Sequence, residues 1–176
     1  MGKKRAEETA TQEEESFNMN GTEGVNVDSD FNLTDDYKPP ALVPQGNYNA
    51  NVVGLSFDNS ANCLVWKVTL AENDEDLVCS DGETKIDGQT FYYRNWLPKA
   101  SDKELMTASG RMTKWQAKIN MFADFCKNMN LSVNNAQDVA ELVESGEMIG
   151  ASVLINIKIG EYQGKAKNEI DKMVAN

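Results

Sequence analysis

Residues 149–159 read Ile-Gly-Ala-Ser-Val-Leu-Ile-Asn-Ile-Lys-Ile, and this stretch decides the class of fold. Every second residue, from the first isoleucine to the last, is apolar, whereas most residues between them are small or polar. A period of two is typical of a β-strand with one buried face. Gln163-Gly164 then predicts a hairpin turn into a last strand from Lys165 to about Val174. The C-terminal part of the chain is therefore predicted to be an antiparallel hairpin.

Three further runs upstream predict strands. Residues 45–57 are rich in β-branched and aromatic side chains and end at a turn-forming Asp58-Asn59-Ser60. Residues 63–70 alternate with period two, which places Trp66 on the predicted core face. Residues 90–97 form the third run. Its two faces are Phe91, Tyr93 and Asn95 on one side and Tyr92, Arg94 and Trp96 on the other. Both faces carry aromatic rings, so the pattern leaves open which face is exposed.

Between the third and fourth strands the pattern becomes helical. Ser101-Asp102-Lys103-Glu104 predicts a capping box that starts a short helical turn ending near Gly110. A longer helix is expected to open at Thr113, and another piece is expected over residues 136–145 before Gly146. The longer helix has an apolar stripe at helical spacing, which we interpret as a core face with partner docking as the alternative. The stripe consists of Trp115, Ile119, Phe122, Cys126 and Met129.

The predicted order is β-β-β-α-β-β, which gives a mainly β fold with a helical insertion. Five strands interrupted by a helix at that point are typical of the oligonucleotide/oligosaccharide-binding (OB) barrel. The expected domain covers residues 39–176, and the longer helix is expected to close one end of the barrel. The order of elements does not by itself assign a function.

Residues 1–38 differ in composition from the rest of the chain. They hold ten of the 28 acidic residues and few large apolar ones, so they cannot bury enough surface to offset their ordering entropy. We expect a flexible acidic tail that ends at Pro39-Pro40. The net charge of the whole chain is −11, which excludes a generally basic surface of the kind that coats nucleic acid non-specifically.

The reactive residues argue against an enzyme. The chain has no histidine, which excludes histidine-based catalytic triads and histidine-ligated metals, and it has no Gly-rich phosphate loop. Cys63, Cys79 and Cys126 form no Cys-x-x-Cys pair, so we expect reduced, intracellular thiols, with the last packed as a small hydrophobe. The acids of residues 72–87 are expected to be solvated rather than to bind a cation. We expect no catalytic residue, metal site, cofactor or membrane span.

Residues 88–100 are a positive, aromatic segment within this acidic chain, because they contain no Asp or Glu. Single-stranded nucleic acid is bound by bases that stack on aromatic rings and by cations that follow the phosphates. Core packing is an equal alternative for each aromatic ring, and an exposed charged edge is an equal alternative for the lysines of the last hairpin. The candidate DNA-binding residues are Tyr92, Arg94, Trp96, Lys99, Lys67, Lys158, Tyr162, Lys165 and Lys167.

Two short motifs resemble those of a known family. Pro44-Gln45-Gly46-Asn47-Tyr48 resembles the Pro-x-Gly-x-Tyr entry to the first strand of phage-encoded single-stranded DNA-binding proteins with an OB fold. Residues 162–170 resemble the Tyr-x-Gly-x-x-x-Asn-x-Ile ending of that family, and the resemblance covers about residues 40–174. It implies a non-enzymatic protein of the host cytoplasm that coats transient single strands in replication or recombination. Replication or recombination proteins are candidate partners of the acidic tail, and the oligomeric state stays open.

Two other classes of function stay open from the sequence. A structural or assembly module of a virus or phage would use the barrel for protein interaction and would not bind nucleic acid. The acidity of the chain favours this alternative. An enzyme subunit or inhibitor that mimics DNA would instead act through its acid-rich surface. The aromatic and basic segment favours DNA binding over both alternatives.

Overall fold

The computed structural model describes residues 33–176, and the chain divides after Pro39 into two units. The first unit includes one helical turn, α1 (Leu33–Asp36), where the sequence suggested a tail without regular structure. The expectation of a flexible tail over residues 1–32 lies outside the described residues. The second unit, Pro40–Asn176, contains the sheet and both longer helices of the described residues.

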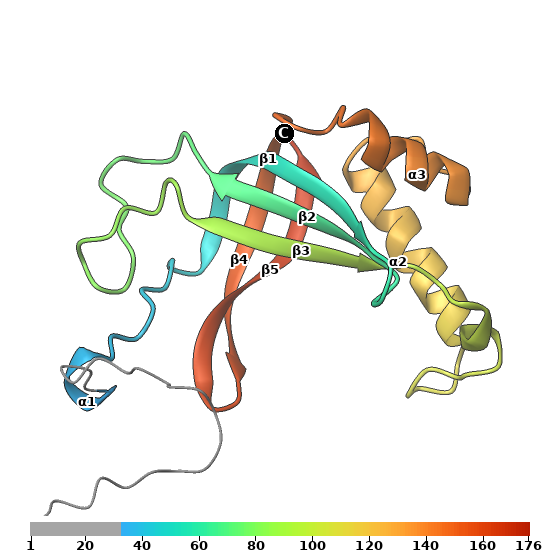
Figure 1. Cartoon of the computed structure of the whole chain (residues 1–176), viewed down its shortest axis with the longest axis horizontal. Helices are drawn as coiled ribbons and strands as arrows, with labels where there is room; N and C mark the ends of the chain where they lie inside the picture. The colour runs from blue at the N-terminus through green and yellow to red at the C-terminus, as the bar shows by residue number, and fades with distance from the viewer. Residues whose placement is uncertain (1–32) are drawn as a thin grey trace, which may run out of the picture. The chain divides into compact units, whose positions relative to one another are not determined.

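Five antiparallel strands form one open sheet in this second unit (Figure 1). Their order across the sheet is β3-β2-β1-β4-β5, so β1 is central and β3 and β5 are the edges. All five predicted strands are confirmed, and the helical insertion lies between β3 and β4 as expected. The strands are β1 (Gly46–Asp58), β2 (Cys63–Leu70), β3 (Thr90–Trp96), β4 (Ser152–Tyr162) and β5 (Lys165–Ala175).

The start of β4 differs from the sequence prediction by three residues. The strand begins at Ser152, whereas the alternating pattern starts at Ile149. The N–H of Ile149 donates to the carbonyl of Gly146 in a turn, and Gly150 has a φ of 89°, which a strand does not allow. The apolar alternation therefore runs on into the turn that precedes the strand.

The β4–β5 hairpin has the predicted turn. Gln163 and Gly164 have φ values of 52° and 74°, and positive values at both positions are what a two-residue hairpin turn of type I′ requires. Pairing between β1 and β4 begins at Gly46 and Ile157, so beyond Ile157 the two strands of the hairpin have no further strand pairing with β1. This part projects past the other strands in Figure 1.

The inserted segment contains the 3-10 helix η1 (Ala100–Lys103), α2 (Lys114–Asn128) and α3 (Ala136–Ser145). The predicted helix start at Thr113 is confirmed, because its hydroxyl accepts a hydrogen bond from the N–H of Gln116. The α3 helix has the predicted bounds and ends at Gly146, which has a φ of 64°.

The predicted capping box at Ser101 is wrong. Ser101 lies inside η1, and this helical turn ends at Lys103 rather than near Gly110. The carboxylate of Asp102 takes the capping role, since Oδ2 accepts from the backbone N–H of Lys99 at 2.8 Å and from Nζ of Lys118 at 2.8 Å. The carboxylate is a charged acceptor, which makes both hydrogen bonds strong.

The core lies between the inner face of the sheet and the C-terminal half of α2. Trp66 is fully buried, as predicted, and its ring centroid lies 5.3 Å from that of Phe125. The ring of Tyr93 stacks on Phe125 at 5.6 Å. These contacts join α2 to β2 and β3.

The predicted core stripe of α2 is correct only in its second half. Cys126 and Met129 are buried, whereas Trp115 and Phe122 are only half-buried and Ile119 is 40% exposed. Phe125, which the stripe omitted, takes the central position instead. The buried residues of α2 all lie near its C-terminal end, so the first half of the helix contributes little to the core.

Candidate nucleic-acid interface

The β3 strand presents Tyr92, Arg94 and Trp96 to solvent. The exposed fractions are 56% for Tyr92 and 52% for Trp96, and Arg94 is exposed between them. The residues on the other face are buried or half-buried against the core. The predicted alternation of the two faces along this strand is therefore confirmed, and the exposed face is the one that carries Tyr92.

Lys67 continues this face onto β2. It is exposed and pairs directly with Tyr92 across the β2–β3 ladder. On its other side lies Gly54 of β1, where an added Cβ would come within 3.4 Å of the Cβ of Lys67. A Cβ at this position would be in ordinary van der Waals contact with the lysine stem, so the pairing itself and not the glycine places Lys67. The β2 and β3 strands together place a cation beside an exposed ring.

The chain leaving β3 is fixed by the β1–β2 turn. The Asn62 side chain donates from Nδ2 to the carbonyl of Leu97 at 2.9 Å, and its backbone carbonyl accepts from the Leu97 N–H at 2.9 Å. Asn62 itself has a φ of 55°, a conformation that asparagine tolerates better than most residues. The clamp positions exposed Lys99, which follows two residues later.

The carboxylate of Asp58 lies close enough to Arg94 for their charges to interact. The pKa of Asp58 is lowered mainly by hydrogen bonds from the Ala61 N–H and the Ser60 hydroxyl, and the positive charge of Arg94 adds to this effect. Asp58 is thus held in its own turn, where its Oδ1 accepts from Ser60 Oγ at 2.7 Å. Within residues 33–176 Arg94 forms no ion pair, so its guanidinium is available to an anionic ligand.

The opposite end of β2 and β3 is acidic. The connecting loop of residues 71–89 carries seven carboxylates and one lysine. Some of these carboxylates stabilise the loop itself, as Asp81 does by accepting from the N–H and the hydroxyl of Thr84. No group of His, Cys, Asp or Glu in the described part of the chain could hold a metal ion. A polyanion is therefore disfavoured at this end of the face.

The remaining candidates lie on the β4–β5 hairpin. Lys158 forms an ion pair with Asp171 at 2.7 Å, and Lys167 forms one with Glu169 at 2.9 Å. The ammonium of Lys167 also lies 5.1 Å from the ring centroid of Tyr162, which is 60% exposed. Lys165 is exposed and pairs directly with Tyr162 across the turn. The hairpin thus groups Tyr162, Lys165 and Lys167 near its tip. Neighbouring acids offset part of the positive charge, which also fits the alternative of an exposed charged edge.

The residues of the two family-like motifs have structural roles. The Asn168 side chain accepts from the Val43 N–H at 2.8 Å and donates to the Val43 carbonyl at 2.7 Å. The Tyr48 hydroxyl donates to the Pro44 carbonyl at 2.9 Å, and a Cβ at Gly46 would come within 3.2 Å of that hydroxyl. These contacts join the entry of β1 to β5. Gly46, Tyr48 and Asn168 of the motifs therefore help to build the fold.

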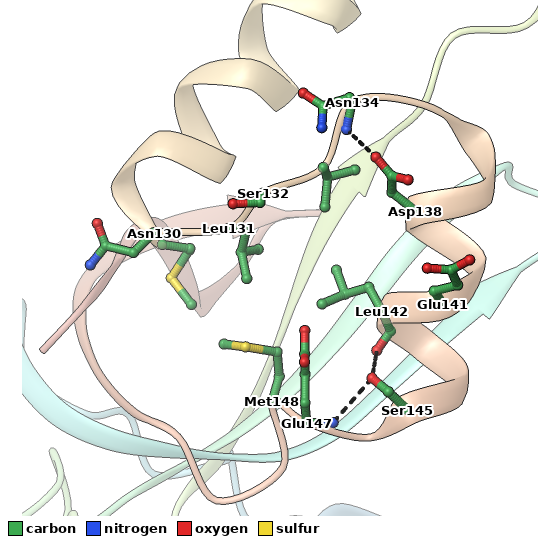
Figure 2. Close-up of a pocket in the computed structure, with 12 residues that line it drawn as sticks. Asn130, Leu131, Ser132, Asn134, Asp138, Glu141, Leu142, Ser145, Glu147 and Met148 are labelled. Carbon is green, nitrogen blue, oxygen red and sulfur yellow. Dashed lines mark hydrogen bonds between the residues drawn. The ribbon is translucent and has the colours of Figure 1, made fainter.

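A hollow of about 590 Å³ between the C-terminal end of α2 and α3 is a separate feature (Figure 2). Its lining includes the carboxylates of Asp138, Glu141 and Glu147 and no basic side chain. The Asp138 carboxylate accepts from the Asn134 N–H at 2.7 Å. Because the lining is acidic, this hollow is unsuited to a nucleic-acid strand.

Sequence reasoning missed a second group of basic residues, on η1 and the first half of α2. The signal was present, since residues 105–123 contain no Asp or Glu but include Arg111, Lys114 and Lys118. The predicted core stripe covers the same stretch of the chain as these basic residues. The role of Asn62 at the end of β3 has no signal in the sequence, because it depends on contacts between residues 35 positions apart.

Cys63, Cys79 and Cys126 are all free and buried, and burial raises the pKa of each thiol. Within residues 33–176 no helix is both long and apolar enough to cross a membrane. Comparison of the chain with protein-family models and with curated proteins gives no match.

Proposed function

We propose that this protein is a non-enzymatic single-stranded DNA-binding protein. The observation that carries the proposal is the exposed row of Tyr92, Arg94 and Trp96 on β3, with Lys67 beside it on β2. The proposal keeps the resemblance to phage-encoded single-strand binders, and with it a role in replication or recombination in the host cytoplasm.

The row has the chemistry that binding to single strands needs. Tyr92 and Trp96 lie four residues apart on one face, a separation of about 13 Å along an extended strand. Bases stack on the two rings, and each stacked base contributes about 1–3 kcal/mol. Arg94, midway between the rings, and Lys67 bind the phosphates that link the stacked bases. Such contacts discriminate weakly between sequences, because every base has a face that can stack.

We further infer that the open sheet is an OB-type barrel. Its strand order, with the helix between β3 and β4, fits that Greek-key fold. Irregular pairing at Val53 and Asp171 bends β1 and β5, and Cα atoms of the two edge strands come within 8 Å of each other. In the OB fold, ligands bind to strands two and three and to the adjoining loops.

Titration of fluorescently labelled oligonucleotides with the full chain tests this function. We expect oligo-dT to bind more tightly than a duplex of equal length, and we expect the affinity to fall linearly on a log–log plot against salt. A parallel titration with oligo-U measures the preference for DNA over RNA. Folded protein that binds no oligo-dT at low salt would reject the proposal and favour an assembly module that does not bind nucleic acid.

A further inference from the structure

Charge is strongly segregated within the folded unit. Residues 88–123 carry six basic and two acidic side chains, in a chain whose net charge is −11. One of the two acids, Asp102, is buried and forms an ion pair with Lys118 at 2.8 Å. Apart from Lys118, the basic residues that follow β3 in this range are exposed, and within residues 33–176 they form no ion pair. They are Lys99, Lys103, Arg111 and Lys114.

These residues follow directly after β3 in the chain. Trp96 ends β3, Lys99 caps η1, and η1 packs on the first half of α2 through the ion pair of Asp102 with Lys118. Figure 1 shows β3 ending beside α2, with η1 and the loop of residues 104–113 at the N-terminal end of that helix. A ligand that leaves the ring of Trp96 in this direction therefore meets η1 and α2 next.

The surface found there combines cations with apolar side chains. The Lys103 ammonium lies 4.6 Å from the ring centroid of Trp115, which is half-buried. Met112 lies near Trp115 in the sequence and is 38% exposed. Arg111 and Lys114 are exposed neighbours of Met112 in the sequence. We define the α2 platform as Lys103, Arg111, Met112, Lys114 and Trp115.

We propose that the α2 platform is a second contact area for the same single strand, so that the strand runs from the β3 face past Lys99 onto η1 and α2. This inference rests on the proposed function. The acidic loop of residues 71–89 disfavours the strand at the other end of β3, which leaves the platform as the favoured direction. Exposed cations with an aromatic ring are the combination that single strands bind, and here they follow the first contact area directly in the chain.

Length-dependent binding of dT6 and dT16 by the full chain tests the platform. In the double variant Arg111→Ala/Lys114→Ala we expect the salt slope for dT16 to fall in magnitude by about 1.4, which is two lost single-strand phosphate contacts. Trp115→Ala is expected to weaken dT16 binding by about fivefold or more. Both effects are expected to be larger for dT16 than for dT6, because only the longer strand reaches the platform. Lys127→Ala, an exposed lysine at the other end of α2, is the matched control.

Three outcomes separate the possible explanations. If the platform variants bind dT16 as the wild type does, while Arg94→Ala weakens both oligonucleotides, the platform proposal is overturned and the proposed function stands. If Arg94→Ala is also silent, the β3 face is rejected as the binding site together with the platform, whereas the proposed function itself is rejected only if the wild type binds neither oligonucleotide. If the double variant loses binding to a poly-glutamate probe but keeps dT16 binding, the platform belongs to an acidic protein partner. Circular dichroism of each variant, together with the single variant Lys114→Gln, distinguishes lost contacts from lost folding.

Discussion

The indole N–H of Trp66 donates a 2.8 Å hydrogen bond to Oδ1 of Asn95, and both side chains are buried. Asn95 pairs with Leu64 in the β2–β3 ladder, so the bond runs diagonally across the inner face of the sheet. Because side chains alternate along a strand, an inward Asn95 directs Arg94 and Trp96 outward. One buried polar contact thus supports the exposure of the candidate binding face.

Replacing Asn95 with Ala is expected to lower the free energy of unfolding by about 1–3 kcal/mol, because the buried Trp66 N–H loses its acceptor. Urea denaturation monitored by tryptophan fluorescence measures the change. Asn156→Ala is the matched control, since its 2.8 Å bond to Asn47 lies at the surface and its loss is expected to cost little. Equal losses in the free energy of unfolding of the two variants would show that the buried hydrogen bond to Trp66 contributes no more to stability than the surface bond does.

The second prediction concerns α2. Phe125→Ala is expected to cost about 3–5 kcal/mol of stability, because this ring fills the space between Trp66 and Tyr93. Ile119→Ala, on the exposed part of the same helix, is expected to change stability by no more than about 0.5 kcal/mol. Thermal or chemical denaturation of both variants makes the comparison. A larger loss of stability for Ile119→Ala than for Phe125→Ala would support the core stripe predicted from the sequence and contradict the packing of α2 described above.

The sequence predicted the strands well because each has one face in the core, and this imposes a period of two. It could not select the exposed face of β3, because both faces carry aromatic rings and the choice depends on Trp66, which lies 29 residues away from Asn95. It also could not tell which half of α2 meets the sheet. Helical spacing identifies an apolar face, but the length of contact depends on how far the sheet extends under the helix. The basic group after β3 was visible in the sequence as a lack of acids.

The third prediction is a pH dependence that originates at Asp102. Hydrogen bonds from Lys118 and from the Lys99 N–H hold the pKa of its carboxyl below the ordinary value of 3.8. A lowered pKa in the folded state stabilises the protein above the ordinary value, and this contribution is lost as the pH falls toward the folded pKa. Asp102→Asn is therefore expected to lower the Tm at neutral pH, with a difference from wild type that shrinks below about pH 4.

Melting curves between pH 2.5 and 7 measure this difference. Asp124→Asn, an exposed acid of α2, controls for the loss of one acidic charge. A difference between Asp102→Asn and wild type that stays constant over the whole pH range would show that the ion pair with Lys118 does not contribute to the pH dependence.

The fourth prediction concerns the acidic N-terminal segment. Deletion of residues 1–38 removes ten acidic and four basic residues. We expect the thermal stability of the remaining chain to stay nearly unchanged, because that segment has little apolar material to bury. Its affinity for oligo-dT is expected to rise, since a competing polyanion is removed. Unfolding of the shortened chain, or an unchanged affinity, would contradict this account of the segment.

The salt dependence of oligo-dT binding by the Arg94→Ala variant tests the central claim most directly. If Arg94 binds one phosphate between bases stacked on Tyr92 and Trp96, the log–log salt slope is expected to fall in magnitude by about 0.7 relative to wild type. Trp96→Ala, measured alongside, is expected to cost about 1–3 kcal/mol of binding free energy with little change in slope. A folded Arg94→Ala variant whose affinity and salt slope equal those of the wild type would contradict the β3 face as a single-strand binding site.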